Sequence, residues 1–187
     1  NVITVRVFDA AIEGGITSGE IGIFVNKNDM DLEVTLRGLW DFKLIGRSYP
    51  SHAPSEEGEW PQLMVPGRWE HQGFKDYDGN AWYRKKVFIP KELQGVELVL
   101  MLGKIDDFDD VYINGELIGT SRLGPNYRNG TAYDKLRIYF INPSQFKAGE
   151  WNVISVFVED LKGFGGIYEG PVGIVKQSQF TRYMRWR

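Results

Sequence analysis

Residues 110–121 read DVYINGELIGTS, and the Asn114–Gly115 pair at their centre separates two short apolar runs. Both residues tolerate the positive φ angles of a two-residue type I′ turn, so the stretch predicts a β-hairpin. Further short runs rich in β-branched and aromatic residues flank it, with turn residues between them. These runs are residues 34–46, 81–90, 96–103, 135–141 and 152–160. The pattern predicts an all-β sandwich of about eight strands.

Alternation of apolar residues supports two of these strands and indicates which residues share a face. On a strand, residues two apart point to the same side of the sheet. The alternating residues are Val96, Leu98, Leu100 and Leu102 in one run and Leu136, Ile138 and Phe140 in the other. Only residues 90–93 and 143–146 resemble short helical turns, and each opens with a proline.

The chain begins with a near copy of one of its later stretches. Residues 1–24 (NVITVRVFDAAIEGGITSGEIGIF) align without a gap with residues 152–175 (NVISVFVEDLKGFGGIYEGPVGIV). The offset far exceeds the roughly 20–50 residues of solenoid repeats, so it indicates a tandem copy of a whole domain. The alternative is that this ribbon adds a pair of strands to the one domain present. A two-stranded ribbon alone is marginal in water, which favours the tandem copy.

The repeat sets the expected domain boundaries. Residues 1–25 are interpreted as the C-terminal strands of a preceding copy, and the Asn- and Asp-rich residues 26–33 as a linker. Residues 34–176 then form one domain of ordinary size, followed by a C-terminal tail at residues 177–187. The chain is therefore expected to be a fragment of a longer protein.

Composition narrows the possible classes of function. A formal net charge of −3 with 42% hydrophobic and 14% aromatic residues is typical of a globular chain with one good core, without the basic surplus of a nucleic-acid binder. No apolar run approaches the ~20 residues of a membrane span. The lack of cysteine excludes a disulfide scaffold and a cysteine-ligated zinc site. We therefore expect neither nucleic-acid binding nor membrane insertion.

Patterns typical of catalysis are weak. A serine esterase needs a nucleophile, a histidine and an orienting acid, whereas this chain has two histidines, His52 and His71, and no G-x-S-x-G elbow. Paired acids for glycoside hydrolysis can be sought in residues 55–60 and 104–110. Acids so close in sequence are more often solvated loop charges. The domain is therefore expected to be non-catalytic.

Four aspartates, Asp106, Asp107, Asp109 and Asp110, stand where one predicted strand ends and the next begins. The favoured interpretation is that they accept backbone N–H bonds that close this turn. A structural calcium ion is the alternative, because aspartate oxygens suit hard cations, although the spacing and glycine of an EF-hand are absent. No other cofactor is indicated.

Several segments in a fixed order resemble the N-terminal sugar-binding jelly roll of family-two glycoside hydrolases such as β-galactosidases. They are GLWDFKL (38–44), WPQLMVPGRWEHQG (60–73), AWYRKKVFIP (81–90), LMLGKIDDFDDVYINGELIGTS (100–121), AGEWNVISVFVED (148–160) and GGIYEGPVGI (165–174). The match runs from Leu36 to Val175 and is similar also to the domain inserted in bacterial sialate O-acetylesterases. It implies a galactose-binding-like jelly-roll β-sandwich in a larger secreted or periplasmic carbohydrate-active protein, with the reacting groups in another domain.

The long polar loop at residues 120–134 (TSRLGPNYRNGTAYD) holds the residues expected to bind carbohydrate. Sugars offer hydroxyls to polar side chains and a C–H face to an aromatic ring. The candidates are Arg122, Asn126, Tyr127, Arg128 and Tyr133, followed by Trp82 and Asp107 from the segments that carry the resemblance. The alternative for the loop is a solvated connection, and for Trp82 and Asp107 a wholly structural role.

The other aromatic residues are expected to be structural. Trp40, Trp69, Trp82 and Trp151 lie in or beside predicted strands next to apolar residues, which is typical of core or rim packing. Arg84 is expected to stack on these rings or to pair beneath them.

Two functions follow, a carbohydrate-binding module of a larger enzyme and a structural support that packs on a catalytic domain. The expected partners are therefore an oligo- or polysaccharide and other domains of the same polypeptide. Exposed aromatic rings beside Arg122, Asn126 and Tyr133 would favour binding, and a large apolar surface patch would favour support. The tandem copy favours binding, because linked modules gain avidity.

Overall fold

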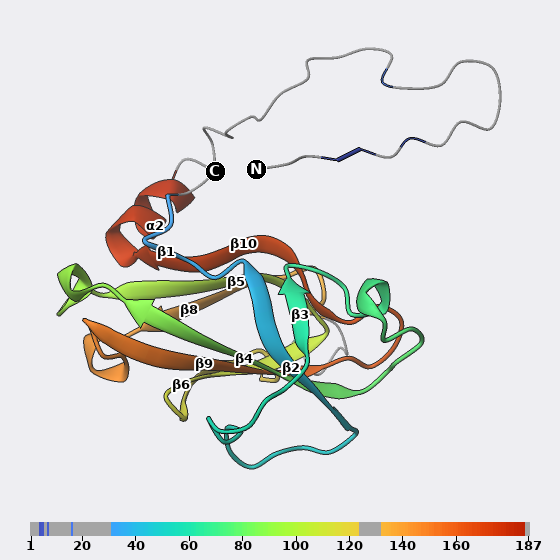
Figure 1. The fold of residues 1–187 in the computed structure, drawn as a ribbon. Coiled ribbons are helices and arrows are strands. Elements are labelled where there is room, and N and C mark those ends of the chain that lie inside the picture. The colour runs from blue at the N-terminus through green and yellow to red at the C-terminus, as the bar shows by residue number, and fades with distance from the viewer. Residues whose placement is uncertain (1–3, 6, 8–15, 17–30, 124–131, 186–187) are drawn as a thin grey trace.

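The fold was established from a computed structural model (Figure 1). The structure describes residues 4, 5, 7, 16, 31–123 and 132–185. Most of the predicted strand and turn at residues 1–23, most of the linker at residues 26–33 and the middle of the candidate loop lie outside these residues. The fold below is that of the remaining domain.

The described part of the chain contains ten strands, which confirms the all-β prediction. They are β1 (Val34–Thr35), β2 (Gly38–Gly46), β3 (Gln62–Val65), β4 (Asn80–Ile89), β5 (Leu98–Asp106), β6 (Phe108–Ile113), β7 (Glu116–Thr120), β8 (Leu136–Ile141), β9 (Glu150–Glu159) and β10 (Gly166–Lys176). Short 3₁₀ turns η1 (Glu70–Gln72), η2 (Lys91–Leu93) and η3 (Pro143–Gln145) and one helix, α2 (Gln177–Met184), complete it. The turns η2 and η3 occupy the two stretches predicted as helical turns.

The strands form two antiparallel sheets that face each other in a jelly-roll-like sandwich (Figure 1). One sheet has the order β1-β10-β5-β8, and the other has the order β3-β2-β4-β9-β6-β7. The β6–β7 hairpin turns at Asn114 and Gly115, whose φ angles of 50° and 84° are those of the predicted type I′ turn. Other neighbours, such as β10 with β5 and β4 with β9, are far apart in sequence, so residues distant along the chain meet at the ends of the strands.

The core lies between the two sheets, and the alternation of side chains along each strand directs one face of the strand into it. Leu98, Leu100 and Leu102 of β5 are fully buried there, as the alternation predicts. Trp40 and Trp69 are also fully buried, whereas Trp151 is 58% exposed on the outer face of β9. Of the predicted core or rim packing, Trp40 and Trp69 show the core form, whereas Trp151 packs at the surface, edge-on to Phe88.

β8 and the C-terminal residues differ from the sequence expectation. The alternating residues Leu136, Ile138 and Phe140 turn away from the core, and the intervening Arg137, Tyr139 and Ile141 enter it. The predicted tail is partly the helix α2, whose buried Phe180 packs against Phe140 with 6.0 Å between ring centres. The outer face of β8 is apolar because α2 covers this sheet, so alternation alone could not tell the core face from the covered one.

Candidate functional site

The structure separates the sequence-predicted site residues into three places. Asn126, Tyr127 and Arg128 lie outside the described residues. Arg122 and Trp82 lie on the outer face of the six-stranded sheet, Tyr133 lies beside β10, and Asp107 lies at the corner between β5 and β6.

Arg122 and Trp82 meet at Phe157 of β9. The guanidinium carbon of Arg122 lies 5.0 Å from the centre of the Phe157 ring, and the Trp82 ring lies edge-on to it at 5.6 Å. Arg122 also pairs with Asp110 and lies 5.5 Å from the ring of Tyr49. Trp82 is only 4% exposed, so it offers little surface to a ligand. Arg122 and Tyr49 are the accessible members of this group.

Arg84 holds a loop over the same sheet face. Its guanidinium pairs with Asp41 at 2.8 Å and donates to the carbonyls of Ser55 and Gly58 at 2.8 and 2.7 Å. The same group stacks on Trp60 at 4.3 Å, so Arg84 does stack on a tryptophan, but not on one of the four rings that were predicted. The loop therefore shields Trp82 from solvent. The accessible candidates, Arg122 and Tyr133, lie at the ends of the strands instead.

An arginine–aromatic ledge, formed by Arg68, Phe164 and Tyr168, lies at one end of the sandwich. The Arg68 guanidinium carbon lies 4.3 Å from the centre of the Phe164 ring and 5.5 Å from that of Tyr168. The Tyr168 hydroxyl donates to the carbonyl of Tyr133 at 2.8 Å. Phe164 and Tyr133 are 48% and 51% exposed. The ledge thus offers ring surface and guanidinium donors side by side.

Close packing around Gly165 fixes the position of Phe164 in the ledge. Gly165 follows Phe164 and lies so near the Trp69 ring that a Cβ atom there would approach it to 1.8 Å. The Gly165 N–H also donates to Glu70 Oε1 at 2.9 Å. Sequence reasoning missed Arg68, Phe164 and Tyr168, although the segments 60–73 and 165–174 flank or contain them. No local pattern marks them, because Arg68 and the two rings that it contacts come from two segments almost 100 residues apart.

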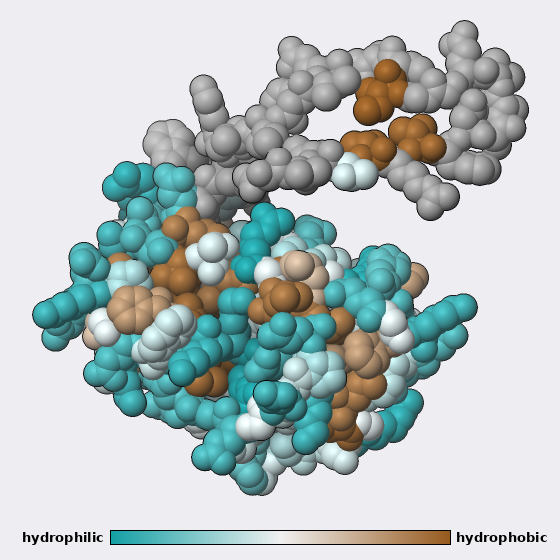
Figure 2. Space-filling model, in the orientation of Figure 1, coloured by the Kyte–Doolittle hydropathy of each residue, from teal (hydrophilic) through white to brown (hydrophobic). Residues whose placement is uncertain are grey.

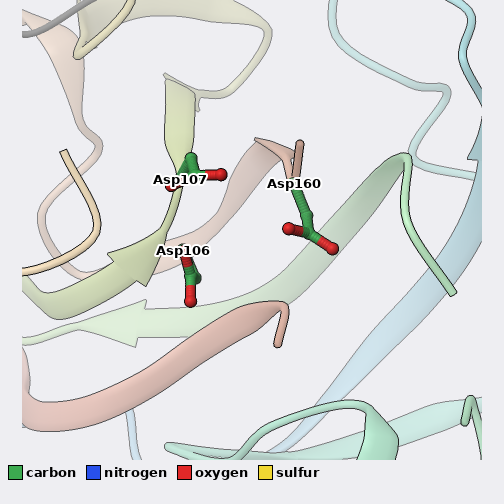
Figure 3. Close-up of side chains that lie close together, drawn as sticks. All are labelled: Asp106, Asp107 and Asp160. Carbon is green, nitrogen blue, oxygen red and sulfur yellow. The ribbon is translucent and has the colours of Figure 1, made fainter. Parts of the chain in front are cut away.

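A carboxylate corner, formed by Asp106, Asp107 and Asp160, adjoins the ledge (Figure 3). One carboxylate oxygen from each residue lies within 4.8 Å of the other two. Asp106 ends β5, Asp107 links it to β6, and Asp160 directly follows β9. Gly166, two residues before Tyr168, pairs with Asp106 across β10 and β5, which brings the corner next to the ledge.

Backbone donors hold part of this corner. The Leu161 N–H donates to Asp107 Oδ2 at 3.1 Å, and the Lys162 N–H donates to Asp160 Oδ1 at 3.0 Å. Asp107 therefore accepts a backbone N–H, but from the loop after β9 and not from the β5–β6 turn that was predicted to be closed. The predicted role is wrong for Asp109 and Asp110, whose carboxylates contact side chains instead.

Burial makes the corner electrostatically unfavourable. Burial, together with the neighbouring Asp107, raises the pKa of Asp106 to about 8 and the pKa of Asp160 to about 7. The Arg68 guanidinium acts in the opposite direction on Asp106 but does not outweigh these effects. At neutral pH the three carboxylates therefore favour a proton or a cation among them.

The described residues show no arrangement typical of nucleophilic catalysis. Ser51 Oγ lies 3.0 Å from His52 Nδ1, but both side chains are exposed and, among the described residues, no carboxylate is bonded to His52. His71 packs edge-on to Phe164 at 6.1 Å. Within the described residues, no helix is long and apolar enough to cross a membrane.

Comparison with known proteins relates part of this chain to part of larger enzymes. No protein-family model matches the chain. It is 31% identical over 94 residues to a β-glucuronidase of Streptococcus agalactiae, a match that covers 48% of this chain and 15% of that enzyme. The match from sequence thus spans less than a fifth of the relative.

Solved structures give the same picture. The fold superposes on a β-glucuronidase of Faecalibacterium prausnitzii with a TM-score of 0.58 and 20% identity, covering 73% of this chain and 22% of the enzyme. A β-glucuronidase of Bifidobacterium dentium gives a TM-score of 0.56 and 25% identity, covering 67% and 20%. The chain therefore has the fold of a sandwich domain of β-glucuronidases, which are family-two glycoside hydrolases, and is similar in sequence to one of them over part of its length.

Proposed function

We propose that this chain is a non-catalytic, carbohydrate-contacting domain of a larger glycoside hydrolase related to β-glucuronidases. The observation that carries the proposal is the match to a limited part, 15% to 22%, of several such enzymes. The reacting groups would lie in the remaining part of such an enzyme, which is about four-fifths of its length. A secreted or periplasmic location remains a prediction from the resemblance.

The arginine–aromatic ledge is the proposed contact surface. An exposed phenyl ring suits the C–H face of a sugar, and a guanidinium beside it suits a hydroxyl or a carboxylate in bidentate geometry. Arg68 and Phe164 supply these groups 4.3 Å apart. Because a uronic acid carries both a C–H face and a carboxylate, an acidic sugar fits this pair better than a neutral one.

Titration with oligosaccharides tests the proposal. We expect the chain to bind oligosaccharides ending in β-glucuronic acid, and to bind neutral galacto-oligosaccharides more weakly. Loss of a hydrogen bond to a charged group costs about 1.5–3 kcal/mol, so Arg68→Ala should weaken binding about 10-fold or more. Trp151→Ala is the control, because Trp151 is exposed on the sheet face rather than at the ledge. Equal affinity of wild type, Arg68→Ala and Phe164→Ala would place any binding elsewhere.

The structural-support alternative has its own observation, because two apolar cross-strand pairs are exposed on the outer face of the six-stranded sheet. Leu39 pairs with Met64, and Phe88 packs edge-on to Trp151 with 5.7 Å between ring centres. The face of the molecule in Figure 2 shows exposed hydrophobic surface divided into patches by polar side chains. If no glycan binds, and oxidative footprinting shows Trp151 protected in the complete enzyme, support is the better description.

A further inference from the structure

We propose that Asp106, Asp107 and Asp160 bind one calcium ion, which ties the β5–β6 corner to the loop between β9 and β10. The three carboxylates converge from strand ends that lie far apart in the sequence (Figure 3). The inference is independent of carbohydrate binding, since it concerns the interior of the corner rather than the ledge.

The observation that points to a ligand is an unsatisfied oxygen. Asp160 is 2% exposed, and its Oδ2 is buried without a hydrogen-bond partner among the described residues, while Oδ1 accepts from the Lys162 N–H. In Figure 3 one oxygen of this carboxylate lies on the side of Asp106 and Asp107, and the other points away from them. A buried carboxylate oxygen without a donor is costly and needs either a proton or a cation.

The dimensions and the ligand type fit calcium. Ca²⁺ binds oxygen at about 2.4 Å, so ligands on opposite sides of the ion lie about 4.8 Å apart. The three carboxylate oxygens all lie within 4.8 Å of one another, which is compatible with one ion of this size among them. Mg²⁺ needs a tighter octahedron at about 2.1 Å and more often keeps its waters. The corner contains oxygen ligands alone, which also suits a hard cation.

The charges around the corner are mainly negative. Besides the three ligands, Glu70 and Asp78 act on Asp160, and Arg68 is the cation that acts on Asp106. No Lys or Arg side chain among the described residues forms an ion pair with the three aspartates at 4.0 Å or less. Without a metal ion, the alternative is a proton shared between Asp106 and Asp107, which are within hydrogen-bonding reach.

The experiment uses the purified chain, which is treated with a chelator to remove bound metal and then transferred to metal-free buffer at pH 7.5. Calcium chloride is titrated by calorimetry, and thermal melts are recorded with calcium, with magnesium or with chelator. We expect about one calcium ion per chain and a rise in Tm of about 5–10 °C at a concentration about 100-fold above Kd. Magnesium should give a smaller rise.

Two variants decide whether the corner is responsible. Asp160→Asn keeps the acceptor for the Lys162 N–H but removes the charge, so it should fold and lose the calcium response. Asp134→Asn, a change at a half-exposed carboxylate paired with Lys135, should keep it. The proposal is overturned if wild type shows no calcium heat and no calcium-dependent Tm, or if Asp160→Asn responds to calcium as wild type does. Should Asp160→Asn fail to fold, Asp106→Asn with the same two measurements serves in its place.

Discussion

Asp109 and the carboxylate corner come from the same run of aspartates, yet their surroundings are opposite. Asp109 is fully buried between the sheets, where it pairs with Arg137 and accepts a hydrogen bond from the Tyr139 hydroxyl. Asp106 and Asp107, two or three residues earlier, meet a third carboxylate instead of a cation. The difference shows that a buried acid acquires its role from the strand that faces it and not from its neighbours in sequence.

Backbone geometry explains the contrast. Asp109 lies on the core-facing side of β6 with Val111 and Ile113, so it looks across the sandwich to β8. Arg137 and Tyr139 project from the core-facing side of β8 to meet it. Asp107 lies before β6 begins, where the neighbour is the end of β9. Thus one acid is neutralised inside the sandwich and the others are left at its rim.

The largest effect is expected when the compensated cluster is broken. Arg137→Met leaves Asp109 charged and buried without its guanidinium, which typically costs about 3–5 kcal/mol in unfolding free energy. Urea unfolding measures the loss. The double variant Asp109→Leu/Arg137→Met should recover part of it, because no unpaired charge remains; a loss below about 1 kcal/mol in Arg137→Met would show that the pair is not essential.

Metal removal from the carboxylate corner should have the next largest effect. At a calcium concentration about 100-fold above Kd, binding stabilises the folded chain by about 2.7 kcal/mol, and chelator removes this contribution. The measurement is urea unfolding with and without chelator. Arg137→Met should lose a different amount on chelation, because the Arg137 guanidinium also donates to the backbone carbonyls of Ile105 and Asp107 at 2.9 and 2.6 Å and so supports the corner. Equal losses would indicate that the two clusters are independent.

Removal of one donor from Asp109 should have a smaller effect. Tyr139→Phe deletes the hydroxyl that donates to the carboxylate and keeps the ring in the core, so we expect a loss of about 2 kcal/mol. Arg137 still compensates the charge. A loss as large as that of Arg137→Met would mean that the ring packing had also changed, which near-ultraviolet circular dichroism would reveal.

The smallest effect is expected for Asp160→Asn in chelator. Removing one of three crowded carboxylates relieves repulsion, so stability should stay within about 1 kcal/mol of wild type or rise. The same variant should be the less stable one when calcium is present. A large loss in chelator would show that the Asp160 charge has a favourable partner, contrary to the comparison above.

Part of the proposed contact surface could be anticipated from the sequence. The arginines and tyrosines of the loop after β7 predict a carbohydrate-binding loop, and in the structure Arg122 and Tyr133 are partly exposed. It does not bring them to one site, since Arg122 contacts Phe157 and Tyr133 contacts Tyr168. The ledge residue Phe164 escaped prediction, because one exposed ring in a glycine-rich loop has no distinguishing local pattern.

Local chemistry in the sequence determined the strands, the Asn114–Gly115 turn and the core face of β5, because each depends on φ preference or period-two alternation within a few residues. Only the tertiary structure decided which face of β8 enters the core and that residues 177–184 form a helix, because α2 and the opposite sheet compete to cover apolar side chains. It alone also brought Asp160 to Asp106 and Asp107. Antiparallel pairing of β9 with β6 aligns positions 41 to 51 residues apart, and no local preference encodes that register.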